Sequence, residues 1–151
     1  TSKDTSIFSF SKDRILKYKK FIKILNFSKK EYIKYLRLVN CFVLPSYREG
    51  FSKTLLEASS AGKLILTTNV PGCRDIVIDK KTGILFSKKN IKSLVEAINY
   101  VIFLSKKQRT RISLAASLRV NKNFSSKKIN KEYLRVISKL LWSYLKLELL
   151  D

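Results

Sequence analysis

Two glutamates, Glu49 and Glu57, stand in a segment whose residue types suit the binding of a phosphorylated ligand. Gly50 carries no side chain and therefore lets a ligand approach the backbone closely. A helix is predicted to begin within the next few residues, and free N–H groups at residues 51–54 would form a site for a phosphate. The two carboxylates can accept hydrogen bonds from the hydroxyls of a sugar and a ribose. The combination indicates a sugar nucleotide.

The elements on either side should place this segment at one edge of a parallel sheet. Residues 41–44 form an apolar run that stops at a proline, which predicts a buried strand. Ser52 suits the N-cap of a helix over about residues 53–61, and Gly62 suits its left-handed end. Ligands of open α/β sheets bind where strands end and helices begin. Glu49 also has a second interpretation, because an acidic side chain near a helix start often only compensates the helix dipole.

The remaining elements predict the fold class. Further strands and extended pieces are expected at residues 21–25, 64–67, 75–78 and 84–86, with turns at 69–72 and 81–83. Helices are expected after capping boxes at Ser28 and Ser105, after an N-cap at Asn90, and from Ser125 or Ser126. The apolar stripe of the last helix is expected to pack against a neighbouring element. Strand–helix units followed by helices indicate an α/β fold, a doubly wound parallel sheet with C-terminal helices.

The composition is that of a folded and strongly basic protein. The chain has 151 residues, of which 45% are hydrophobic, so it fits one domain with a packed core and not a disordered tail. Its formal net charge of +21 favours anionic partners such as nucleic acid, phospholipid headgroups or phosphorylated substrates. A solvated lysine-rich surface is an equally good interpretation, because the excess lysine is spread through every segment.

Several functions are excluded or disfavoured by what the sequence lacks. It contains no histidine, which excludes a histidine base or ligand, and no acidic cluster with metal-site spacing. Cys41 and Cys73 have no partner spacing and are expected to be free thiols in a reducing compartment. No apolar stretch approaches the roughly 18 residues that a membrane span needs.

The segment around Glu49 resembles the glycosyltransferase group 1 family, retaining enzymes of the two-domain GT-B fold. The resemblance covers residues 21–124 and rests on PSYREGF with a second glutamate at Glu57, then EASSAGK, TTNVPGCRD and KTGILF. It implies that Glu49 contacts the transferred hexose and that Glu57 binds the ribose hydroxyls. Backbone N–H groups at the helix start would hold the sugar and phosphates. The expected site is thus Glu49 as the catalytic residue, with Gly50, Phe51, Ser52, Thr54 and Glu57 binding the donor.

The resemblance also implies a domain organisation. Residues 1–20 would be the ragged beginning of a truncated donor domain, residues 21–124 the Rossmann-like nucleotide-sugar-binding half of a GT-B fold, and residues 125–151 a C-terminal helix. The acceptor-binding domain of the family has no counterpart in the sequence. The chain alone is therefore expected to bind its donor weakly and to turn over almost none of it.

Partners and alternatives follow from the same motifs. SYREGF and NVPGCRD are similar to bacterial transferases that add hexoses or N-acetylhexosamines to polyprenol-diphosphate-linked glycans and surface polysaccharides. The resemblance implies a nucleotide sugar such as a UDP-sugar and no metal or other cofactor. The free thiols imply the cytoplasm, and contact with an anionic membrane stays open. One alternative is a non-catalytic transferase relic that associates with a membrane or partner. The other is a basic nucleic-acid-binding module, although the sequence contains no recognisable nucleic-acid-binding motif.

Overall fold

The computed structural model describes Lys20, Phe21, Lys23, Leu25, Asn26 and residues 28–148, with side chains as far as Leu141. Contacts divide the chain into two units, Thr1–Lys34 and Tyr35–Asp151. The sheet and every predicted site residue lie in the second unit. Of the segment 1–20 predicted from the sequence, all but Lys20 lies outside the described residues.

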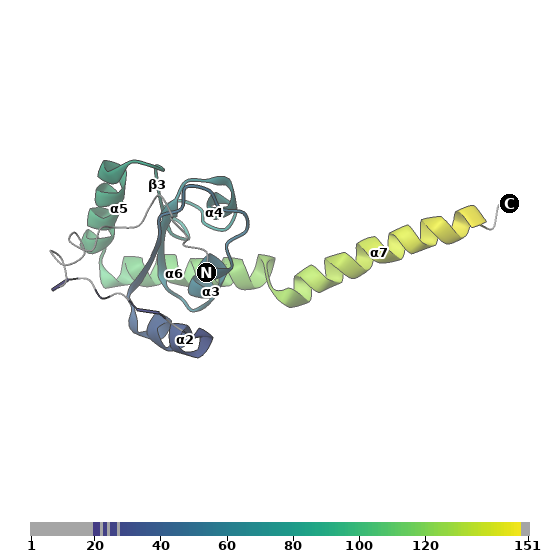
Figure 1. Ribbon diagram of the computed structural model, residues 1–151, viewed down its shortest axis with the longest axis horizontal. Coiled ribbons are helices and arrows are strands. Elements are labelled where there is room, and N and C mark those ends of the chain that lie inside the picture. The colour runs from purple at the N-terminus through teal and green to yellow at the C-terminus, as the bar shows by residue number, and fades with distance from the viewer. Residues whose placement is uncertain (1–19, 22, 24, 27, 149–151) are drawn as a thin grey trace, which may run out of the picture. The chain divides into compact units, whose positions relative to one another are not determined.

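Three parallel strands form the sheet in the order β1-β2-β3. Figure 1 shows this sheet among the helices, with β3 labelled. Their bounds are β1 Cys41–Leu44, β2 Leu64–Thr68 and β3 Ile84–Phe86. Because parallel strands run in one direction, their carboxyl ends meet at one edge, at Leu44, Thr68 and Phe86. The hydroxyl of Thr67 reinforces that edge by donating to the carbonyl of Leu44 at 3.0 Å.

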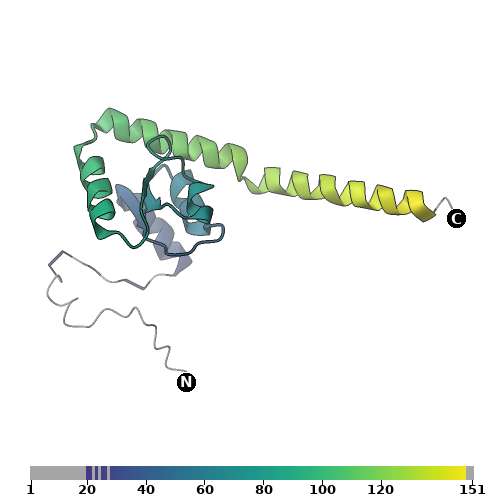
Figure 2. The ribbon, with the colours of Figure 1, turned by 90° about the horizontal axis from the view of Figure 1, so that it is seen from above.

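Helices precede, connect and follow the strands, and Figure 2 shows the sharp bend between α5 and α6. The helix bounds are α2 Lys29–Leu38, α3 Lys53–Ser60, α4 Pro71–Arg74, α5 Ile91–Phe103, α6 Lys106–Asn123 and α7 Ser126–Glu148. Helix α3 packs against α6 and β2, and α5 packs against β3. The expected α/β fold with a parallel sheet is therefore confirmed.

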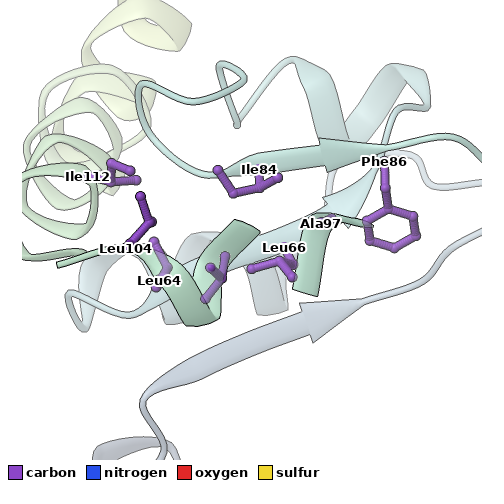
Figure 3. Close-up of a cluster of buried hydrophobic side chains, with 8 residues drawn as sticks. Leu64, Leu66, Ile84, Phe86, Ala97, Leu104 and Ile112 are labelled. Carbon is purple, nitrogen blue, oxygen red and sulfur yellow. The ribbon is translucent and has the colours of Figure 1, made fainter. Parts of the chain in front are cut away.

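The core lies between the sheet and the helices α5 and α6 (Figure 3). Side chains alternate along a strand, so one face of β2 and β3 contributes residues two apart. These are Leu64, Leu66, Ile84 and Phe86, which pack with Ala97, Val101, Leu104 and Ile112 from the helices. Ile65 points to the opposite face and is fully buried, as is Leu55 of α3. Each such side chain stabilises the fold by about 1.5–3 kcal/mol.

The helix ends that the sequence predicted are confirmed. Ser28 and Glu31 exchange hydrogen bonds at the start of α2, and Ser105 and Gln108 form a complete capping box at the start of α6. Asn90 caps α5 by accepting from Ser93 N at 2.9 Å. Each cap involves residues only three positions apart, which is why the sequence alone reveals it.

Four expectations differ from the structure. Phe21, Lys23 and Leu25 are not in a strand, and Ile22 and Ile24 lie outside the described residues. An apolar run becomes a strand only where a second strand supplies hydrogen bonds, and the run itself does not identify that partner.

The other three differences concern a turn, an extended piece and the surface of the last helix. The expected turn at 69–72 is instead the entry to α4, because Pro71 suits the first helical position, and residues 75–78 take turn conformations or none and not an extended strand. The apolar stripe of α7 does not pack as expected: every described side chain from Ser126 to Leu141 is exposed.

Candidate functional site

The connection between β1 and α3 lies at the edge of the sheet where all three strands end. It runs from Pro45 to Ser52 and contains Glu49, Gly50 and Phe51. This is the edge at which open α/β sheets bind their ligands. The predicted site residues thus follow one another along a single strand–loop–helix passage.

Ser52 is the N-cap of α3, as the sequence predicted. Its backbone is extended, its side chain is 2% exposed, and its Oγ accepts from Leu55 N at 3.5 Å. Its carbonyl accepts from Leu56 N at 3.1 Å, and its hydroxyl shares a 3.1 Å hydrogen bond with Thr54 Oγ1. The N–H groups of Lys53 and Thr54 belong to the first helical turn, which has no intrahelical acceptor for them. They are suited to an anionic ligand.

The carboxylate of Glu49 is oriented by a residue near the end of β1. The hydroxyl of Ser46 donates to Glu49 Oε2 at 3.0 Å, and Ser46 N donates to the carbonyl of Leu44 at 3.2 Å. Both Ser46 and Glu49 are half-buried. This hydrogen bond orients the Glu49 carboxylate, which a residue that only compensates a helix dipole does not need. No role for Ser46 was expected from the sequence.

Glu57 and Thr54 share one face of α3, because residues three apart lie one above the other on a helix. Thr54 is exposed and Glu57 is half-buried, whereas Leu55 and Ala58 are fully buried on the core side. The site face and the core face of α3 are therefore separate. The backbone of Glu57 is held in the helix, whose last turn is closed by Ala61 N donating to the carbonyl of Glu57 at 3.0 Å.

Phe51 is 52% exposed, and its ring packs edge-to-face on Phe124. The ring centroids lie 5.2 Å apart at an interplanar angle of 64°. Phe124 is the residue that ends α6, so the aromatic pair joins the loop to a helix more than 70 positions away in the sequence. The sequence offered no signal for this pairing, because nothing in the spacing of two phenylalanines identifies a distant contact.

The charge of Glu49 acts on a buried thiol, that of Cys73. Burial raises the pKa of Cys73, a hydrogen bond with Thr67 lowers it, and the charge of Glu49 raises it again. Cys73 is fully buried in α4. Cys73 was expected only to be a free thiol, and the structure adds that it is a buried packing residue on which the charge of Glu49 acts.

A cavity of about 380 Å³ opens at the same edge of the sheet, next to the loop. Its lining includes Pro45, Ser46, Tyr47, Thr68, Phe86 and Lys89. Lys89 also lies over the ring of Tyr47, 5.8 Å from the centroid. None of the six predicted site residues lines this cavity, so the cavity and the predicted site adjoin but do not coincide.

Two features are absent from the part of the chain that the structure describes. It contains no group of three or more histidine, cysteine, aspartate or glutamate side chains placed to hold a metal ion. Within the same residues, no helix is long and apolar enough to cross a membrane.

Comparison with known proteins gives a consistent result. Residues 10–119 match the profile of the family described as glycosyl transferases group 1. A curated relative from Campylobacter jejuni, N,N'-diacetylbacillosaminyl-diphospho-undecaprenol alpha-1,3-N-acetylgalactosaminyltransferase, is 35% identical over 107 residues, covering 66% of this chain and 28% of its own. The capsular polysaccharide biosynthesis glycosyltransferase CapM of Staphylococcus aureus is 34% identical over 100 residues, covering 66% and 26%.

Among solved structures, the fold is similar to that of Anabaena Alr3699/HepE, which was crystallised in complex with UDP and glucose. The TM-score is 0.75 at 20% sequence identity, and the alignment covers 84% of this chain and 35% of that one. The chain thus spans little more than a quarter of the two curated relatives and about a third of this structure.

Proposed function

The chain belongs to the glycosyltransferase group 1 family and has the α/β architecture of the GT-B fold, and from that premise we propose that it binds the donor in glycosyl transfer. The donor is a nucleotide sugar, and the transferred group is a hexose or N-acetylhexosamine. Transfer proceeds with retention at the anomeric carbon, without a metal ion or other cofactor. The acceptor is a glycan or a polyprenol-diphosphate-linked glycan, since relatives named for these roles match this chain.

The main support for the proposal is the segment from Glu49 to Glu57. It combines an oriented carboxylate, a helix start with available N–H groups, and a second carboxylate on the exposed face of the same helix. In the proposed arrangement Glu49 contacts the transferred sugar and acts as the catalytic residue. The diphosphate lies at the N–H groups from Gly50 to Thr54, and Glu57 accepts from the ribose hydroxyls.

We also propose that this chain alone binds the donor weakly and catalyses almost no transfer. It spans little more than a quarter of its curated relatives. The groups that seat the acceptor and offset the charge of the diphosphate leaving group would lie in the remainder of such a protein. Proximity and charge stabilisation supply much of the rate of an enzyme, so their loss removes turnover before it removes binding.

The test is calorimetric titration of the chain with UDP-sugars and GDP-sugars. Glu49→Gln and Glu57→Gln should each weaken binding by about tenfold or more, because a hydrogen bond to a charged group contributes about 1.5–3 kcal/mol. Glu96→Gln is the matched control, since Glu96 is an exposed glutamate of α5 outside the loop and α3. Equal affinity in all four proteins, or no affinity for any nucleotide sugar, would contradict the proposal.

A membrane contact is proposed as a further part of this function. Between residues 126 and 141, five basic side chains stand with one acidic side chain, and all of them are exposed on α7. The large apolar side chains of the same stretch are exposed as well, among them Leu134 and Leu140 at 64% each. A basic polar face beside an apolar face fits the surface of an anionic leaflet, where lipid-linked acceptors reside. We therefore place the protein at the cytoplasmic face of a membrane.

A further inference from the structure

Helix α4 lies directly beneath the loop that carries Glu49. A Cβ atom added to Gly72 would overlap the carbonyl oxygen of Gly50 and lie 2.6 Å from the carbonyl oxygen of Glu49. Gly72 itself is not in the left-handed region, so its backbone would accept a side chain. The contact with residues 49 and 50, and not the conformation of Gly72, is what excludes any larger residue.

The two sides of this contact differ in how firmly they are held. Helix α4 is anchored at its start, where Asn69 N donates to the carbonyl of Phe86 at 2.8 Å and Val70 is 3% exposed. The loop at Gly50 is exposed and has open space where its own Cβ would be. A side chain at position 72 would therefore displace the loop and not the helix.

The end of α4 is anchored as well, by Arg119 of α6. Its Nε donates to the carbonyl of Ile76 at 3.0 Å and its Nη2 donates to the carbonyl of Asp75 at 2.9 Å. The same guanidinium lies over the ring of Phe124, 5.8 Å from the centroid, and Phe124 packs against Phe51. Arg119 thus contacts both the end of α4 and the ring of Phe124, the two parts of the chain that pack against the loop.

We propose that Gly72 and Arg119 are positioning residues for the donor loop. Gly72 sets how closely the carbonyl groups of Glu49 and Gly50 approach α4. Arg119 fixes the end of α4 near these carbonyls and fixes Phe124 against Phe51. Neither residue touches the donor in this scheme; they determine where the carboxylate of Glu49 and the N–H groups after it lie. The inference rests on the proposed function only for its consequence in donor binding, because the loop geometry can be observed without a donor.

The primary test is the ¹⁵N–¹H spectrum of the chain without ligand. Gly72→Ala should shift the amide signals of residues 49–52, and it should weaken nucleotide-sugar binding by about tenfold or more, the loss expected when the hydrogen bonds of one charged group are misplaced. Gly83→Ala is the matched control. A Cβ there would also crowd its neighbours, 2.9 Å from the carbonyl oxygen of Ile65, but away from the loop. It should lower the melting temperature and leave the signals of residues 49–52 in place.

A second pair of variants keeps the inference testable if Gly72→Ala does not fold. Arg119→Gln removes the two hydrogen bonds to the carbonyls of Asp75 and Ile76, directly after α4, and should shift the signals of residues 49–52. Arg111→Gln changes an exposed arginine of the same helix and should not. Unchanged loop signals in folded Gly72→Ala, or in Arg119→Gln, would overturn the inference. If the loop signals shift but neither wild type nor variants bind a nucleotide sugar, positioning stands and the proposed function fails.

Discussion

At the scale of single residues, Glu49 owes its orientation to the hydroxyl of Ser46 three positions earlier. The carboxylate was predictable from the sequence, because its motif and its place before a helix are local features. The hydrogen bond was not, because a serine after a strand has several acceptors within reach. The need for glycine at position 72 was even less predictable, because the atoms that exclude a side chain there belong to Glu49 and Gly50, more than twenty positions away.

Ser46→Ala should weaken donor binding several-fold without changing the fold. The substitution removes a hydrogen bond to a carboxylate and frees Glu49 to leave its orientation, at a cost of about 1–2 kcal/mol. Titration with the nucleotide sugar measures the effect. Ser113→Ala is the control, because the Ser113 hydroxyl donates to Thr110 in its own helix. Equal affinities of the two variants would mean that the hydrogen bond does not orient the donor-binding carboxylate.

Cys41 should make stability depend on alkaline pH. Burial raises the pKa of its thiol to about 11, with the charge of Arg109 acting against the rise. In the unfolded chain the thiol loses its proton near its ordinary pKa. Its contribution to the free energy of unfolding is therefore fully present below that pKa and is lost as the pH rises toward 11. The decline should be on the order of 1 kcal/mol, below the full value because the thiol is partly exposed.

The measurement is the free energy of unfolding in urea at a series of pH values, for wild type and Cys41→Ala. Lysine and tyrosine residues also titrate in this range, so the difference between the two proteins isolates the thiol. That difference should shrink as the pH rises through the interval between the two pKa values. A constant difference would show that the thiol ionises as easily in the folded protein as in the unfolded one.

At the scale of elements, α3 carries the site on one face and is fastened to α6 by the other. The hydroxyl of Ser60 donates to Asn121 Oδ1 at 3.2 Å, and the hydroxyl of Ser117 donates to the carbonyl of Ser60 at 3.2 Å. The extent of α3 was predictable, because Ser52 and Gly62 mark its two ends. Its partner helix was not, because the choice of neighbour depends on the packing of the whole sheet.

Ser59→Ala should stabilise the protein by about 1 kcal/mol. Ser59 is 1% exposed, and among the described residues its hydroxyl has no hydrogen-bond partner, so the folded state carries an uncompensated desolvation cost. Alanine also has the higher helix propensity. Thermal and urea unfolding would measure the gain. The neighbouring Ser60→Ala removes a partnered hydroxyl and should not stabilise, and a loss of stability in Ser59→Ala would contradict this account.

At the scale of the whole molecule, charge and exposed apolar surface coincide on α7. The sequence predicted the helix and its stripe, but no neighbour among the described residues covers that stripe, because helical spacing reveals which residues share a face and not what covers it. Five of the described side chains between residues 126 and 141 are basic, with Glu132 paired to Arg135 at 3.7 Å. Helix α7 is thus one element whose exposed basic side chains, part of the net charge of +21, are placed to contact an anionic surface.

The chain should sediment with vesicles of phosphatidylglycerol and phosphatidylcholine and not with vesicles of phosphatidylcholine alone. High salt should weaken the binding, because each basic residue near an anionic surface contributes about 1 kcal/mol that counterions screen. Reversing Lys128, Lys131 and Lys139 to glutamate should abolish it. Reversing Lys88, Lys92 and Lys107, which are exposed outside α7, gives the same net charge and should retain most of it. Equal loss in both triple variants would assign the binding to charge in general.

The buried thiol of Cys73 can report local unfolding of α4. With no exposed surface and a raised pKa, this sulfur can react with a disulfide reagent only when α4 leaves its seat beneath Glu49 and Gly50. Its labelling rate therefore counts how often that small cooperative unit opens while the rest of the chain stays folded. A nucleotide sugar that stabilises the loop should lower the labelling rate of Cys73. Ligand binding would then be measured through a sulfur atom that the ligand does not contact.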